Sequence, residues 1–158
     1  PQHQALLAQY EEHQACTSVG GYSPPIRKVG TTVIVRHLPA NCNLARVLKL
    51  WPIDGTFNYL EVPFSASERC YNGRALINFV TYDEAMRFVK KWNGRWVHQT
   101  QEEPLEVSKA RLQGLRMLLQ RFQTKDIQKL DSHGGLPLIC DGMRRLNTKD
   151  TLTMLFHL

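Results

Sequence analysis

The sequence predicts an α+β fold in which a four-stranded antiparallel sheet carries two helices on one face, in the order strand, helix, strand, strand, helix, strand. Two runs, TTVIVRHLP at 31–39 and NGRALINFV at 72–80, read as strands whose alternate residues face a core. Two further segments repeat apolar residues at the spacing of a helix. These patterns place the start of the folded domain at about Val29.

The elements are expected at regular intervals along the chain. The strands are predicted at 31–37, 57–62, 73–80 and 105–110. The first helix, 43–51, is followed by Pro52, which cannot continue a helix. The second helix, 82–93, starts at a capping box made by Thr81 and Glu84.

Beyond the fourth strand, one more apolar stripe predicts a third helix over about 113–123. Its members are Leu115, Leu118, Leu119 and Phe122. The chain is therefore expected to have three parts: a short helix (2–15) with a flexible linker in residues 1–28, the folded domain in 29–111, and a C-terminal helix with an extension in 112–158. The Gly and Pro residues of HGGLPLICDGMRRLN indicate an ordered extension and not a separate domain.

Two of the strands carry a pair of short motifs. Val33–Leu38 matches the pattern aliphatic, aromatic, aliphatic, any, Asn, Leu, and residues 72–80 match basic, Gly, aromatic, Gly or Ala, aromatic, aliphatic, any, aromatic. With GTFNYLEVPF, YDEAMRF and VSKARLQGL, they make residues 30–122 resemble the RNA-recognition motif (RRM) of the Mei-two-like carboxy-terminal type. This resemblance implies a ferredoxin-like βαββαβ sandwich and a noncatalytic RNA-binding module.

The departures from the motifs lie on the face that binds RNA in the family. The motifs carry aromatic side chains at the positions of Ile34, Arg74 and Leu76. Members of the family also often have an aromatic residue at the position of Glu61. Because stacking one base on an aromatic ring is worth about 1–3 kcal/mol, the loss of the two rings at Arg74 and Leu76 alone removes roughly 2–6 kcal/mol. Any RNA affinity must therefore come from other groups.

Alternation along the strands places a mixed set of side chains on the open face of the sheet. We expect Tyr59 to stack a base, Asn78 to read a base edge, and arginines to stack or to bind phosphate. The candidate RNA-binding residues are Ile34, Arg36, Tyr59, Arg74, Leu76 and Asn78 in the sheet, with Arg144 and Arg145 in a loop of the extension. Single-stranded RNA bound in this way would be held with low sequence specificity.

An alternative interpretation treats Ile34, Tyr59 and Leu76 as an apolar patch that another element covers. The cover would be the third helix of the chain, through Leu115, Leu118, Leu119 and Phe122, or a protein partner bound by the same stripe. The chain would then be a structural subunit of a larger protein or ribonucleoprotein assembly.

Composition excludes several other classes. No apolar run approaches the roughly 20 residues of a membrane span. Four scattered cysteines predict neither a zinc site nor a disulfide framework and favour a reducing intracellular compartment, without indicating which one. No nucleophile elbow, carboxylate pair or phosphate loop is present, so neither an enzyme nor a cofactor is expected. The net charge is +6, and residues 109–158 hold nine Lys and Arg against four Asp, which favours a polyanionic partner.

Overall fold

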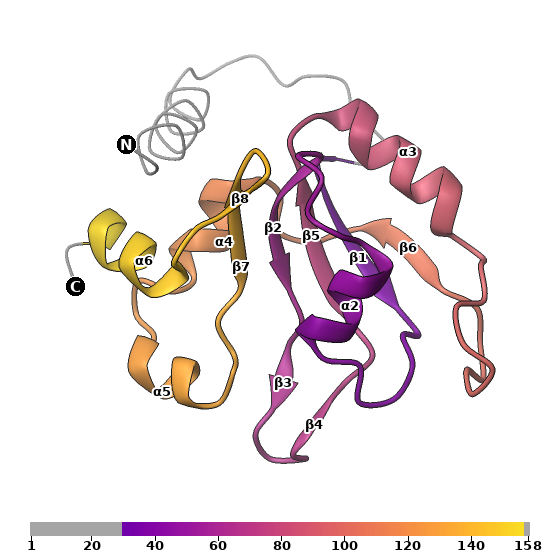
Figure 1. The fold of residues 1–158 in the computed structure, drawn as a ribbon, viewed down its shortest axis with the longest axis horizontal. Helices are drawn as coiled ribbons and strands as arrows, with labels where there is room; N and C mark the ends of the chain where they lie inside the picture. The colour runs from indigo at the N-terminus through magenta and orange to yellow at the C-terminus, as the bar shows by residue number, and fades with distance from the viewer. Residues whose placement is uncertain (1–29, 157–158) are drawn as a thin grey trace.

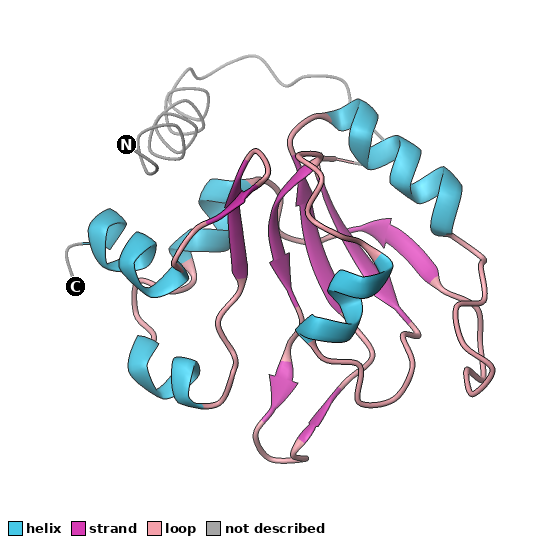
Figure 2. Cartoon of the chain, in the orientation of Figure 1, coloured by secondary structure: helices cyan, strands magenta, loops and turns pink. Residues whose placement is uncertain are grey.

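The computed structural model describes residues 30–156. The helix expected at 2–15 and the linker up to residue 28 lie outside these residues. Figures 1 and 2 show the arrangement of the elements. They are β1 (Thr32–Arg36), α2 (Leu44–Leu50), β2 (Phe57–Glu61), β3 (Phe64–Ser65), β4 (Cys70–Tyr71), β5 (Ala75–Phe79), α3 (Tyr82–Trp92), β6 (Glu106–Lys109), α4 (Leu115–Gln120), α5 (Ile127–Ser132), β7 (Leu138–Asp141), β8 (Arg144–Arg145) and α6 (Thr148–Phe156).

The main sheet has six strands in the order β6-β1-β5-β2-β7-β8, and its neighbouring strands are antiparallel. Its four strands β6, β1, β5 and β2 are those predicted from the sequence, so the α+β sandwich is confirmed. The expected number of strands was too low, because the C-terminal extension adds β7 and β8 beside β2. Arg144 and Arg145 therefore lie in a strand and not in a loop.

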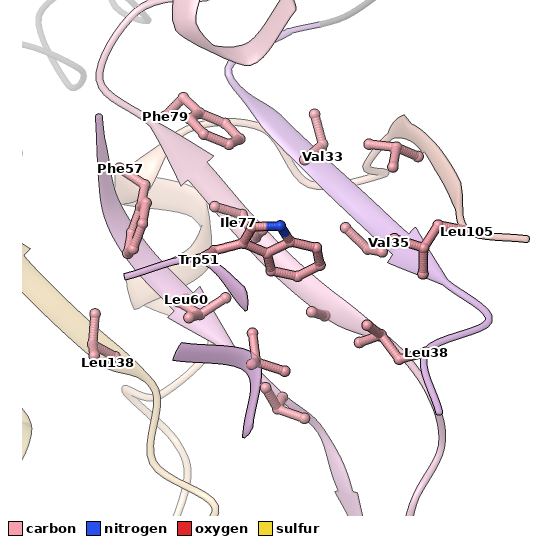
Figure 3. Packing of buried hydrophobic residues seen from close by; sticks show 14 of the residues in the cluster. Val33, Val35, Leu38, Trp51, Phe57, Leu60, Ile77, Phe79, Leu105 and Leu138 are labelled. Atoms are coloured by element: carbon pink, nitrogen blue, oxygen red, sulfur yellow. The ribbon is translucent and has the colours of Figure 1, made fainter. Parts of the chain in front are cut away.

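The first core fills the space between the sheet and helices α2 and α3, and Figure 1 shows α2 in front of the strands. Trp51, at the end of α2, occupies the centre of this layer, and Figure 3 shows Ile77 and Leu60 beside it. The capping box is formed as predicted, because the Thr81 side chain accepts a hydrogen bond from the backbone N–H of Glu84. The extension also contributes to this core, through Leu138 and Cys140 of β7.

A β-bulge at Asn58 sets the faces of β2. Phe57 pairs with Phe79 and Tyr59 pairs with Asn78, so Asn58 is the extra residue between two adjacent pairs. As a result Phe57 joins the core under the helices while Tyr59 joins a second core on the opposite face. Without the bulge, the two rings would lie on the same face of the sheet.

The second core forms on the face of the sheet that was predicted from the sequence to be open to ligands. Helix α4 passes behind β7 in the view of Figure 1, and its apolar stripe packs with Tyr59 of β2 and Ile139 of β7. Leu146 and Leu152 complete the cluster from the last part of the chain. The C-terminal segment is thus built into the same fold as the strands and helices before it.

A chain of buried polar groups fixes the connection that leads into α4. The Asn78 amide donates to the Asn58 Oδ1 at 2.8 Å, and the Thr32 hydroxyl donates to the Asn78 Oδ1 at 2.7 Å. The backbone N–H of Gly114 then donates to the Thr32 Oγ1 at 2.9 Å. These bonds run across β2, β5 and β1 and end at the first residue before α4, so they determine where the helix starts.

The Gln113 side chain completes this anchor. Its amide accepts from the Thr32 N–H at 3.1 Å and donates to the carbonyl oxygens of Thr32 and Ala110, both at 2.8 Å. A Cβ atom on Gly30 would lie 1.9 Å from the Gln113 Oε1, so only glycine leaves room for the amide. Gly114 has a φ of 87°, which glycine adopts without the steric cost of a side chain.

Replacing Asn78 tests the polar chain. Asn78→Ala removes the acceptor of the Thr32 hydroxyl and the amide donor to the Asn58 Oδ1, and a buried polar group that loses such a hydrogen bond costs about 1–3 kcal/mol. We expect the free energy of unfolding, measured in urea, to fall by about 2–4 kcal/mol. The exposed Gln128→Ala is the matched control and should stay within about 0.5 kcal/mol of the parent. Equal stability of the two variants would show that the polar chain does not anchor the fold.

Candidate nucleic-acid interface

Half of the face predicted to bind RNA is covered. Tyr59 is 0% exposed, Asn78 is 3% exposed and Glu61 is 8% exposed. The expectation that Tyr59 stacks a base and Asn78 reads a base edge is therefore wrong for this structure. The ring lies in the second core, and both polar ends of the Asn78 amide are used by neighbouring strands.

Glu61 and Tyr59 hold the far end of α4. The Tyr59 hydroxyl donates to the Glu61 Oε1 at 2.6 Å, and the Arg121 Nη2 donates to the Tyr59 hydroxyl oxygen at 3.0 Å. Arg121 also forms an ion pair with Glu61. Because Arg121 directly follows α4, the acidic residue that replaces an aromatic in β2 serves as the anion for the covering helix.

The stripe expected to bind a partner is used within the chain. Leu115, Leu118 and Leu119 are 0% exposed and Phe122 is 1% exposed. Their neighbours are the sheet residues Tyr59 and Ile139. Of the alternatives raised by the sequence, the structure thus selects the third helix of the chain as the cover, and these four side chains are not accessible to a partner.

Removal of the cover costs more free energy than the stacking of one base on Tyr59 provides. Burial of one large apolar side chain is worth about 1.5–3 kcal/mol, so the four side chains of the stripe contribute up to about 6–12 kcal/mol. If α4 left the sheet, stacking of a base on the Tyr59 ring would contribute only about 1–3 kcal/mol. The half of the sheet that α4 leaves free is therefore the part of this face open to a ligand.

The free half forms a groove of about 420 Å³ over β1, β5 and β6. We call it the sheet groove and define it by Ile34, Arg36, Leu76, Lys109, Arg111 and Leu112. Three apolar side chains and three cations therefore line one surface. Register places Ile34 beside Leu76, whereas Lys109 ends β6 opposite Val33, and Arg111 and Leu112 follow that strand.

All three charged side chains that line the sheet groove are cations. Arg36 is oriented by its neighbours: the Nη1 donates to the Ser108 hydroxyl at 3.2 Å and lies 3.7 Å from the Glu106 Oε1. Lys109 and Arg111 are exposed and form no ion pair with any other residue in 30–156. Two cations are consequently available to a negatively charged ligand, and a third is held in place beside them.

The structure does not bring all predicted residues together. Ile34, Arg36 and Leu76 lie in the sheet groove, whereas the exposed Arg74 lies just before β5. Arg144 and Arg145 are exposed on β8, four strand spacings or about 19 Å from β1. The sequence argument missed Lys109, Arg111 and Leu112, although all three belong to the VSKARLQGL stretch on which part of the family resemblance rested.

Other kinds of site find no support in the described residues. Within 30–156, no three His, Cys, Asp or Glu side chains are grouped so that they could hold a metal ion. In the same part of the chain, no helix has the length and apolar character needed to cross a membrane. Burial raises the pKa of the Cys140 thiol to about 11, so Cys140 is a packed core residue and not a reactive thiol.

The covering helix makes the stability of the chain sensitive to alkaline pH. Burial, and then the Glu61 carboxylate, raise the pKa of Tyr59 well above its usual value, while Arg121 opposes the shift. An unfolded tyrosine loses its proton near pH 10, so the unfolded state binds fewer protons than the folded state above that pH. We expect the contribution of Tyr59 to be complete below about pH 10 and to be lost as the pH rises further.

Urea unfolding between pH 8 and pH 11 tests this expectation. Tyr59→Phe should be less stable than the parent at pH 8, but its free energy of unfolding should fall less on going to pH 11. Tyr71→Phe, which changes a ring outside this cluster, should keep the steeper fall of the parent. Identical pH profiles for the parent and Tyr59→Phe would contradict the buried position of the hydroxyl.

Comparison with known proteins agrees with this fold and these motifs. Residues 30–123 match the family model described as RNA recognition motif 2. The MEI2-like 1 protein of Arabidopsis thaliana is 29% identical over 106 residues, which cover 64% of this chain and 11% of the relative. The MEI2-like 3 protein of Oryza sativa subsp. japonica is 27% identical over the same length, with 64% and 11% covered.

The chain thus spans only about a tenth of the length of these relatives. Among solved structures, the RRM of Rna15 with bound RNA (GU) aligns with a TM-score of 0.47 and 16% identity, covering 61% of this chain and 99% of that one. The predicted resemblance to the Mei-two-like RRM is confirmed by the family model and the relatives. The chain belongs to the RNA recognition motif 2 family, a family of RNA-binding modules.

Proposed function

We propose that this chain is a noncatalytic module that binds single-stranded RNA in the sheet groove, on the half of the sheet that α4 leaves free. The observation that carries the proposal is the arrangement of Arg36, Lys109 and Arg111 around an apolar floor on the face that binds RNA in the family. A basic groove with apolar contacts for bases is the usual design of a surface for single strands.

The chemistry of the groove suggests a division of roles. Lys109 and Arg111 are free to neutralise phosphates, which carry most of the affinity for nucleic acids. Ile34 and Leu76 offer an apolar floor to an unstacked base, and the planar Arg36 guanidinium offers a stacking surface beside it. No aromatic side chain is among the groove residues, so each base is held less tightly than on an aromatic platform.

Low sequence specificity follows from the same set of residues. Phosphate contacts position a nucleic acid but carry no sequence information, and the amide expected to read a base edge is buried. We infer that binding depends strongly on salt and weakly on sequence. Arg74 is an additional phosphate contact beside the groove, and Arg144 and Arg145 form a second contact for an RNA long enough to reach β8.

The alternative function, a scaffold that uses the sheet face for protein contacts, is less well supported. The main observation in favour of a scaffold was the apolar stripe of Leu115, Leu118, Leu119 and Phe122. In the structure this stripe packs against the chain's own sheet. Membership in an RNA-binding family favours the module over the scaffold.

Fluorescence anisotropy with a labelled pool of random 12-nucleotide RNA, titrated at several salt concentrations, tests the groove. We expect the double variant Lys109→Ala, Arg111→Ala to bind at least about tenfold more weakly and to flatten the salt dependence, because a single-stranded ligand loses a slope of about 0.7 for each phosphate contact. Arg74→Ala should show a smaller loss of the same kind.

Matched controls decide where the RNA lies. Lys129→Ala removes an exposed cation from α5 and should leave the affinity within about twofold of the parent. Arg144→Ala with Arg145→Ala should weaken binding of a 12-nucleotide RNA more than that of a 5-nucleotide RNA. An unchanged affinity and salt slope in the Lys109, Arg111 double variant would overturn the proposed site.

A further inference from the structure

A second groove lies on the opposite face of the sheet, between α2 and α3. Its volume is about 280 Å³, and we call it the helix groove. Trp51, Phe88 and Trp92 form its aromatic wall, and Phe57 and Phe79 of the sheet also line it. The Trp51 ring meets Phe88 edge-on at a centroid distance of 5.0 Å and Trp92 at 5.7 Å.

Trp51 contributes a polar group that nothing in the described chain uses. The side chain is 6% exposed, and its Nε1 has no hydrogen-bond partner among residues 30–156. In Figure 3 this nitrogen lies at the upper edge of the indole, on the side where both Val33 and Phe79 are drawn, and Phe79 also lines the helix groove. Because buried N–H groups almost always have an acceptor, this exception points to an acceptor supplied by another molecule.

The charges around the helix groove indicate what kind of molecule this is. Arg87 is already paired with Glu84 at 2.6 Å, and the Asp54 carboxylate accepts the N–H and hydroxyl of Thr56. Lys91 forms no ion pair within residues 30–156, and its Nζ lies 5.5 Å from the Trp92 ring centroid.

Further cations stand in the last turns of both helices, where Lys49 and Lys90 are exposed. Trp51 at the end of α2 touches Trp92 at the end of α3, so these lysines lie at the ends of the helices that meet at the groove. Lys49, Lys90 and Lys91 outweigh the one negative charge of the Asp54 carboxylate, which also has no ion pair within residues 30–156, so the net charge of this rim is positive and favours a negatively charged occupant.

We propose that the helix groove is a docking site for an acidic peptide segment of a partner protein, with one bulky apolar side chain inserted between α2 and α3. A volume of 280 Å³ lies just below the range of small-molecule pockets, so it suits a single side chain. A carbonyl of the segment accepts from the Trp51 Nε1 after a small movement of the ring, and a carboxylate pairs with Lys91. The sheet groove stays accessible, because it lies on the other face.

Nuclear magnetic resonance of the ¹⁵N-labelled full chain tests the proposal. The probe is a five-residue peptide with blocked ends, in which two aspartates on each side flank one phenylalanine. We expect a saturable downfield shift of the Trp51 indole N–H signal and shifts of the Lys91 and Trp92 signals. Lys91→Glu should weaken binding at least about tenfold, while Lys129→Glu on α5 should leave it unchanged.

Three results would overturn the proposal. The first is an equal response to the matched peptide in which lysines replace the aspartates. The second is the absence of a saturable shift when the peptide is added to the full chain at millimolar concentration. If binding then appears after residues 1–29 are removed, the proposal is also overturned, because the occupant of the groove would be the chain itself. The third is a response confined to Ile34, Leu76 and Arg111, which would place an acidic ligand in the sheet groove instead.

Discussion

The packing of α4 across β2 is the contact on which the rest of this structure depends. It is fixed at its start by the hydrogen bonds of Gln113 and Gly114 to Thr32, and at its end by the ion pair of Arg121 with Glu61. Between these points the apolar stripe buries the Tyr59 ring. A family fold with one open face thereby becomes a fold with two cores, and β7 contributes side chains to both.

The same contact explains why the binding face departs from the family motifs. Glu61 stands where an aromatic is frequent in the family, and an aromatic there could not pair with Arg121. The Asn78 side chain forms hydrogen bonds with both Thr32 and Asn58. The positions that stay partly exposed, Ile34 and Leu76, are apolar but not aromatic. Cations that follow the fourth strand, Lys109 and Arg111, flank them. On the proposed function, affinity for RNA therefore rests on charge more than on stacking platforms.

Periodicity in the sequence was sufficient for the elements whose partners are close in the chain. The β1 and β5 strands, both main helices and the α4 stripe were predicted to within about two residues. The β7 strand was missed because its pairing with β2 joins residues nearly 80 positions apart and involves only Tyr59 and Leu60 of β2.

The exposure of Tyr59 was predicted wrongly for a related reason. Alternation along a strand shows on which face of the sheet a side chain lies, but it does not show whether a helix from a distant part of the chain covers that face. The Lys109 and Arg111 cations were visible in the sequence, yet only the folded chain shows that they line the same groove as Ile34.

Hydrogen–deuterium exchange of the chain with and without saturating single-stranded RNA tests the central claim that α4 is a permanent cover. We expect the amides of Leu115–Gln120 and of β2 to keep their protection when RNA is bound, with new protection confined to β1, β5, β6 and the connection to α4. Loss of protection in Leu115–Gln120 on RNA binding would show that the helix leaves the sheet, and that the whole face, including Tyr59, receives the RNA.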